Sequence, residues 1–217
     1  MGFFSKMFGR RDSDAKFVSH SDPNGFLREA TALKKEGNLD AAIAKLREAY
    51  DAIATTNFTY DVKPFLRLPM YLQEAGRNDE AWKELNNLLL GFPNQLQSHE
   101  VLPMTHSIIY DRMRLFLQRE KKLEKAVLFS MFSYLCWVKG LFLQRRGREL
   151  KDCINREAIE QAIEPTIRKA KMTDLARQLV DIVEREAVRA PDIDLRRVEE
   201  EFRVVKPNAE SSGQSRS

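Results

Sequence analysis

The chain has 217 residues, of which 31% are charged and 43% hydrophobic, and its formal net charge is +4 at pH 7. This length is enough to bury a substantial core without requiring more than one domain, and the composition is ordinary for a soluble helical protein. No stretch shows the sustained alternation and hairpin turns of β-strands, so we expect an all-α protein.

We expect residues 1 to about 23 to form a flexible leader, in which a short apolar cluster precedes a polar spacer. If the apolar cluster forms a short helix, the spacing places Phe3, Phe4 and Phe8 on one face beside basic residues. Such a segment contacts an anionic membrane surface or fills a hydrophobic groove; alternatively, the rings pack on the first hairpin or stay loosely ordered. The apolar part is too short for a secretory signal, and Lys6 stands where a myristoylation pattern needs Ser or Thr.

The run from Gly37 to Ala49 indicates the turn and second helix of a helical hairpin. Gly37 follows a helix-favouring segment and supplies the left-handed backbone that ends a helix. Asn38 or Asp40 then caps the next helix. After the cap, apolar residues recur at three- and four-residue spacing, as expected for one helical face: Ala42, Ile43, Leu46, Ala49, Tyr50 and Ile53.

Three later segments repeat this hairpin pattern with decreasing fidelity. When the copies are aligned on the first alanine of the second helix, the equivalent residues are Ala42, Ala81, Ala126 and Ala176. The spacings between these alanines are 39, 45 and 50 residues. Repeated hairpins of this kind build stacked helical scaffolds, which usually bind partners rather than catalyse reactions.

The first two copies, with their small aligned residues and with Pro93 after the second hairpin, resemble the tetratricopeptide repeat family over about residues 24–93. The spacings exceed that family's repeat of roughly 34 residues, and the later copies match only as hairpins. The resemblance implies a right-handed stack of antiparallel helical hairpins, an α-solenoid of about four irregular units over 24–205. For residues 206–217 the polar composition predicts a disordered tail. The alternative is an irregular helical bundle with one chance hairpin motif.

Peptide-binding members of this family use basic residues on the first helices of their units, which line a concave surface. The corresponding candidates here are Lys63, Arg67, Arg112 and Arg114. Lys63 and Arg67 lie four residues apart and point in one direction if a single helix contains both, which suits an acidic peptide. The asparagines of the family's carboxylate clamp are not matched, and Pro69 predicts a helix break just beyond Arg67.

The segment from Ala126 to Val138 is apolar all around a helix and has thirteen uncharged residues before Lys139. That number is too small for a bilayer span, so we expect a helix that is buried on both sides or covers a partner. Core packing is the favoured interpretation of Tyr134 and Trp137. The alternatives are that they line a peptide groove or a self-association interface.

Positive charge concentrates between residues 111 and 151. This segment contains eleven Lys and Arg and four Asp and Glu, so its local net charge is +7. The sharpest cluster in this segment is Arg145, Arg146 and Arg148. Such a segment attracts nucleic acid, anionic membrane or an acidic partner. No recognised nucleic-acid motif accompanies it, so a solvated basic face is the favoured interpretation, and binding through this segment is the alternative function.

The sequence carries no recognised catalytic or metal-binding pattern. His20, His99 and His106 lack ligand spacing, and no glycine-rich phosphate loop or nucleophile elbow is present. Cys136 and Cys153 fit buried free thiols of a reducing compartment. We therefore expect no enzyme activity, metal or cofactor, and a cytoplasmic adaptor or scaffold that presents a helical groove to a protein or peptide partner.

Overall fold

The computed structural model describes residues 22–56, 60–91, 101–144 and 154–206. These ranges contain helices and turns and no strand, which confirms the all-α prediction. The chain divides into two compact units between Asn86 and Asn87.

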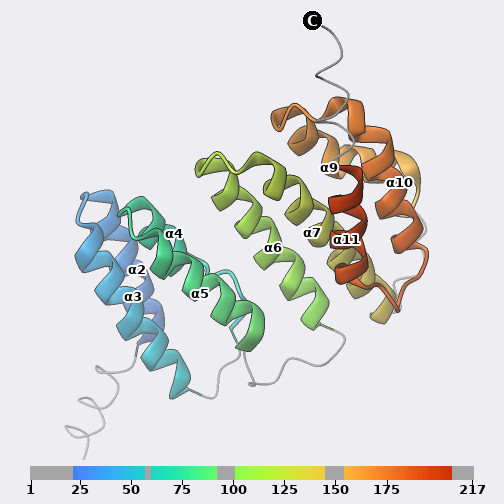
Figure 1. The fold of residues 1–217 in the computed structure, drawn as a ribbon. Coiled ribbons are helices and arrows are strands. Elements are labelled where there is room, and N and C mark those ends of the chain that lie inside the picture. Colours follow the sequence, from blue (N-terminus) through green and yellow to red (C-terminus); the bar gives the residue numbers. More distant parts are fainter. Residues whose placement is uncertain (1–21, 57–59, 92–100, 145–153, 207–217) are drawn as a thin grey trace, which may run out of the picture. The chain divides into compact units, whose positions relative to one another are not determined.

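The first unit consists of two helical hairpins, drawn in blue and green in Figure 1. Their helices are α2 (Pro23–Lys35) with α3 (Leu39–Ala54), and α4 (Arg67–Glu74) with α5 (Asn78–Gly91), whose last residues pass the unit boundary. Asn38 is the residue that caps α3, because its side chain accepts a hydrogen bond from the N–H of Ala41 at 3.3 Å. Asp40 lies in the first turn of α3, where its negative charge interacts favourably with the positive end of the helix dipole.

Tyr50 links the two hairpins of the first unit. Its hydroxyl donates to the carbonyl of Pro64 at 2.8 Å and accepts from the N–H of Leu68 at 3.2 Å, at the start of α4. Burial raises the pKa of Tyr50, so the hydroxyl stays protonated and keeps its donor role. One partly buried side chain of α3 therefore holds the turn before α4 and the start of that helix.

The turns of the four aligned hairpins share one backbone geometry. Each contains a residue with a left-handed backbone, with φ values of +82°, +77°, +60° and +57° at Gly37, Gly76, Lys121 and Lys171. That residue donates its N–H to the carbonyl three residues earlier, and the next residue donates to the carbonyl five residues earlier, which is the Schellman arrangement. In every copy it precedes the aligned alanine by five residues, so the sequence alignment identified four equivalent turns.

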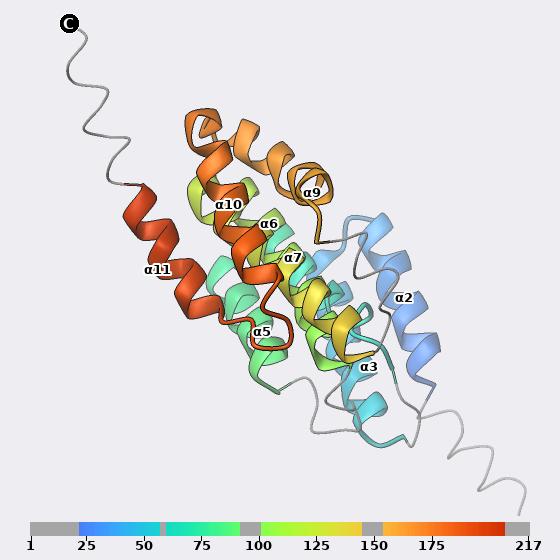
Figure 2. The same ribbon diagram turned by 90° about the vertical axis from the view of Figure 1, so that its right-hand side faces the viewer.

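The second unit is organised around one long helix. Its helices are α6 (Leu102–Arg119), α7 (Leu123–Leu143), α9 (Arg156–Lys169), the short 3₁₀ helix η1 (Thr173–Leu175), α10 (Ala176–Ala187) and α11 (Leu195–Val205). Helix α7 packs against α6, α9, α10 and α11 (Figures 1 and 2). The covering helices contribute fully buried residues at helical spacing, such as Ile159, Ile163 and Ile167 of α9.

Helix α7 confirms the core interpretation of the apolar segment and corrects its length. It runs for 21 residues and continues through Lys139, so it is the one helix in the described ranges that is long and apolar enough to cross a membrane. Two thirds (67%) of its most apolar window is buried inside the protein. Packing within the second unit therefore accounts for its apolar character.

A buried carboxylate fastens α11 to α10. Glu186, only 3% exposed, accepts from the backbone N–H of Asp194 at 2.6 Å, at the N-terminus of α11. Arg197 donates to its other oxygen at 3.0 Å, and Arg189 approaches the same oxygen at 3.5 Å. A buried charge is tolerated when it is paired and hydrogen-bonded in this way.

The shared turn geometry makes a paired prediction. Changing Gly37 to Ala should lower the free energy of unfolding of the first unit by about 1 kcal/mol, because a Cβ is disfavoured at positive φ although nothing else lies within 4 Å of it. Changing Lys121 to Gly should raise the free energy of unfolding of the second unit by about 0.5 kcal/mol, because glycine adopts the left-handed backbone without the cost of a Cβ. Urea unfolding, followed separately through Trp82 and Trp137 in single-tryptophan variants, measures both; changes of the opposite sign would contradict the shared geometry.

The Glu186 network makes a second prediction. Changing Glu186 to Gln keeps the size of the side chain but removes the charge that holds Arg197 and Arg189, so stability should fall by about 2–3 kcal/mol. The matched control is Glu199→Gln, which breaks only the exposed pair with Arg203 and should cost less than about 0.5 kcal/mol. Equal effects of the two substitutions in urea unfolding would show that the buried network is not important for stability.

Candidate functional site

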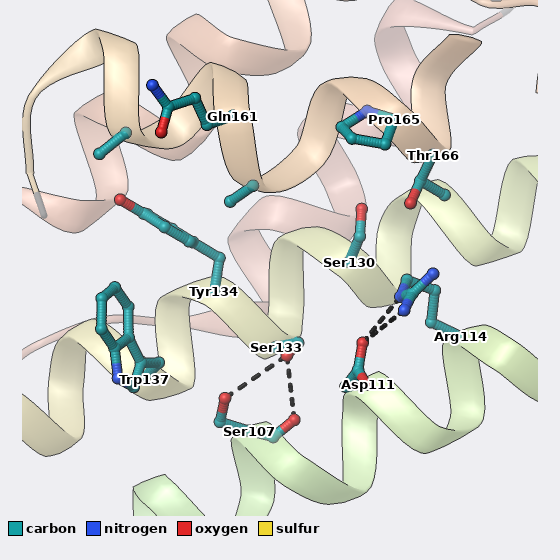
Figure 3. A pocket seen from close by; sticks show the side chains of 12 residues that line it. Ser107, Asp111, Arg114, Ser130, Ser133, Tyr134, Trp137, Gln161, Pro165 and Thr166 are labelled. Atoms are coloured by element: carbon teal, nitrogen blue, oxygen red, sulfur yellow. Dashed lines mark hydrogen bonds and ion pairs between the residues drawn. The ribbon is translucent and has the colours of Figure 1, made fainter. Parts of the chain in front are cut away.

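An open groove of about 620 Å³ lies within the second unit, where α6 and α9 flank α7 (Figure 3). Its size is in the range of pockets that hold small molecules or a few residues of a peptide. Helix α6 contributes Ser107, Asp111 and Arg114; α7 contributes Ser130, Ser133, Tyr134 and Trp137; α9 contributes Ala158, Gln161, Ala162, Pro165 and Thr166.

The α6 side of the groove carries an ion pair. Nε and Nη2 of Arg114 donate to the same oxygen, Oδ1 of Asp111, at 2.9 and 2.7 Å. The Asp111 side chain is 47% exposed and that of Arg114 is 20% exposed, so the carboxylate is the more accessible partner. Because the two charges cancel and the other described lining residues are uncharged, the lining has no net charge.

Small hydroxyl side chains line the groove where α6 and α7 meet. Ser133 donates to the carbonyl of Ser107 at 2.9 Å, and the two hydroxyl oxygens lie 3.4 Å apart (Figure 3). Ser130 donates to the carbonyl of Val127, one turn earlier in α7, at 2.6 Å. These short side chains leave space that a leucine or phenylalanine at the same positions would fill.

An aromatic pair lies at one end of the groove. The rings of Tyr134 and Trp137 are tilted by 57° with their centroids 5.8 Å apart. Tyr134 is buried, as the core interpretation predicted, whereas Trp137 is only partly buried, and both line the groove. Within the described residues the indole N–H of Trp137 has no hydrogen-bond partner, so it is a free donor.

The α9 side contains a proline in the interior of a helix. Pro165 is the tenth of the fourteen residues of α9 and has no N–H, so the carbonyl of Gln161 receives no helical hydrogen bond. Proline at such a position costs roughly 3 kcal/mol relative to alanine. This feature was not predicted from the sequence, where the available signal was a proline between Ile163 and Ile167, two residues of one apolar helical face.

The four predicted partner-binding residues differ in their surroundings. Arg114 lines the groove, whereas Arg112 lies on α6 outside the lining. The expectation that Lys63 and Arg67 share a helix is wrong, because α4 begins at Arg67 and Lys63 is exposed in the preceding turn.

Arg67 is turned toward its own unit, where its Nη1 lies 3.3 Å from the carbonyl of Leu27 and 3.4 Å from the hydroxyl of Thr31. The break predicted at Pro69 is also wrong. Pro69 lies in the first turn of α4, where its missing N–H would have no helical partner.

Two other sets of predicted site residues lie outside the described residues. They are the basic cluster Arg145, Arg146 and Arg148 and the leader residues Phe3, Phe4 and Phe8. Nucleic-acid or membrane contact through these residues therefore stays a prediction.

The titratable groups near the groove have little catalytic character. Burial raises the pKa of the Cys136 thiol, on the core side of α7, to about 12, so it is not a nucleophile at neutral pH. Burial lowers the pKa of His106 on α6. In the described ranges no three His, Cys, Asp or Glu side chains are grouped to hold a metal ion.

Comparisons of the chain with protein-family models, with curated protein sequences and with solved structures found no match. The lining of the groove combines hydrogen-bonding groups, one neutralised ion pair and an aromatic end.

Proposed function

We propose that this chain is a non-enzymatic cytoplasmic adaptor that binds a segment of a protein partner in the groove of the second unit. The observation that carries the proposal is the composition of the groove, where Trp137 and Tyr134 lie at one end and polar groups follow along α6 and α9. Aromatic surface supplies contact area, and spaced polar groups fix orientation.

We further propose that the four hairpins are irregular tetratricopeptide-like repeats stacked in one solenoid. The identical turn geometry at Gly37, Gly76, Lys121 and Lys171 supports this proposal, as does the constant distance to the aligned alanine. In such a stack α6 and α9 are the first helices of consecutive hairpins. These are the helices that line the concave surface in the family that the sequence resembles.

The alternative function, binding of nucleic acid or anionic membrane through residues 111–151, has less support. Arg114 is neutralised by Asp111, and Lys122 forms an ion pair with Glu120 at 2.7 Å. A phosphate in the groove would also approach the exposed carboxylate of Asp111, which costs repulsion. The groove itself therefore favours a peptide over a polyanion.

The proposed function predicts that filling the groove abolishes binding. Peptides selected on the wild-type chain from a display library of random twelve-residue peptides should bind Ala162→Trp at least tenfold more weakly, because the indole occupies the space beside α7. The matched control is Arg168→Trp, which places the same side chain on the exposed side of α9 outside the lining. Fluorescence anisotropy measures both affinities.

Two outcomes would contradict the proposed function. One is that no selected peptide loses affinity on Ala162→Trp, which would place binding elsewhere. The other is that both tryptophan variants lose affinity equally while circular dichroism shows both folded, which would indicate an unspecific effect of tryptophan on α9.

A further inference from the structure

Pro165 is unfavourable for its own helix, and it lines the groove. The helix on either side is regular, with Asn155 as its N-cap and three fully buried isoleucines on one face. Pro165 itself is exposed, so its ring adds nothing to the core. The cost of a proline in a helix interior is therefore not offset by packing inside the protein.

What the proline changes is one backbone carbonyl. The carbonyl of Gln161, one turn earlier, would accept the N–H of residue 165 in an uninterrupted helix, and with proline it is left as a free acceptor. Gln161 and Pro165 both line the groove. The amide nitrogen of the Gln161 side chain is engaged elsewhere, because Nε2 donates to Glu157 at 3.2 Å.

A free donor lies on the facing helix. Figure 3 shows Trp137 and Gln161 on opposite sides of the groove, with Tyr134 between them. The indole N–H of Trp137 has no partner in the described residues, as noted above. The aromatic end of the groove thus offers one unused donor and one unused backbone acceptor, the two groups that complement the C=O and N–H of a peptide main chain.

We propose that the occupant of the groove is an extended, unstructured segment of a protein partner, held by its main chain: one peptide N–H donates to the carbonyl of Gln161 and one peptide C=O accepts from Trp137. This inference rests on the proposed function. A helical occupant is disfavoured, because its N–H and C=O groups are already paired and the two groove groups would be buried without partners. The neutral lining also suits an uncharged main chain.

The test is a double-mutant cycle between the peptide backbone and Pro165. The probe is the tightest-binding peptide from the random twelve-residue library, synthesised with one N-methyl group at each position in turn. On the wild-type chain, N-methylation of the donating position should weaken binding by about three- to tenfold. In Pro165→Ala the helix supplies its own N–H to the Gln161 carbonyl. The unmethylated peptide should then bind Pro165→Ala about three- to tenfold more weakly than it binds the wild-type chain. N-methylation at the donating position should cause no further loss of affinity for this variant.

A second readout separates this role from structural damage. Pro165→Ala should raise the thermal unfolding temperature while it weakens binding, whereas a damaged site would lose both stability and affinity. The control is Pro103→Ala, at the second residue of α6, where proline leaves no helical carbonyl without a partner, so affinity should stay unchanged.

The outcomes distinguish the two proposals. If Ala162→Trp blocks binding but Pro165→Ala binds the peptide as well as the wild type does, main-chain recognition is overturned and the groove remains the site. If N-methylation weakens binding to Pro165→Ala as much as it weakens binding to the wild type, the proposed hydrogen bond to the Gln161 carbonyl is overturned. If neither variant affects any selected peptide, the proposed function itself falls.

Discussion

The covering of helix α7 is the constraint on which the second unit depends. This helix carries apolar side chains around most of its circumference, and each large one contributes about 1.5–3 kcal/mol when it leaves water. Four helices surround it as a result. One stripe of α7 differs, because Ser130, Ser133, Tyr134 and Trp137 follow one another at helical spacing and all line the groove. The groove is thus the side of α7 that has hydroxyl groups and rings in place of aliphatic side chains.

The hairpin turns could be predicted because they depend on local backbone chemistry. A left-handed residue followed by a capped helix is recognisable from a glycine and the small residue five positions later. The same register located the turns at Lys121 and Lys171, where no glycine is present, since the alanine and the apolar spacing still mark the start of the second helix. Lysine adopts this conformation at a modest cost, which explains why the later copies look weaker in sequence than in structure.

The groove could not be predicted, because it arises from contacts between residues far apart in the chain. Arg114 and Trp137 are candidates that the sequence offers, but α9 supplies the opposite side, and no local pattern indicates that Pro165 borders a groove. The error at Arg67 has a related cause. A four-residue spacing indicates a shared face only within one helix, and α4 begins at Arg67, after a turn whose Pro64 carbonyl accepts a hydrogen bond from Tyr50.

Three residues of the second unit conflict with their local backbone: the lysines at two hairpin turns and the proline inside α9. The lysine turns are common structural compromises, because an exposed αL residue ends a helix at small cost. The proline is different, since its cost is larger and no core contact offsets it. In natural proteins such uncompensated local conflicts concentrate at functional sites. Pro165 borders the groove, one turn from the carbonyl it releases, and so adds to the support that the groove lining gives for the proposed binding on this face of the second unit.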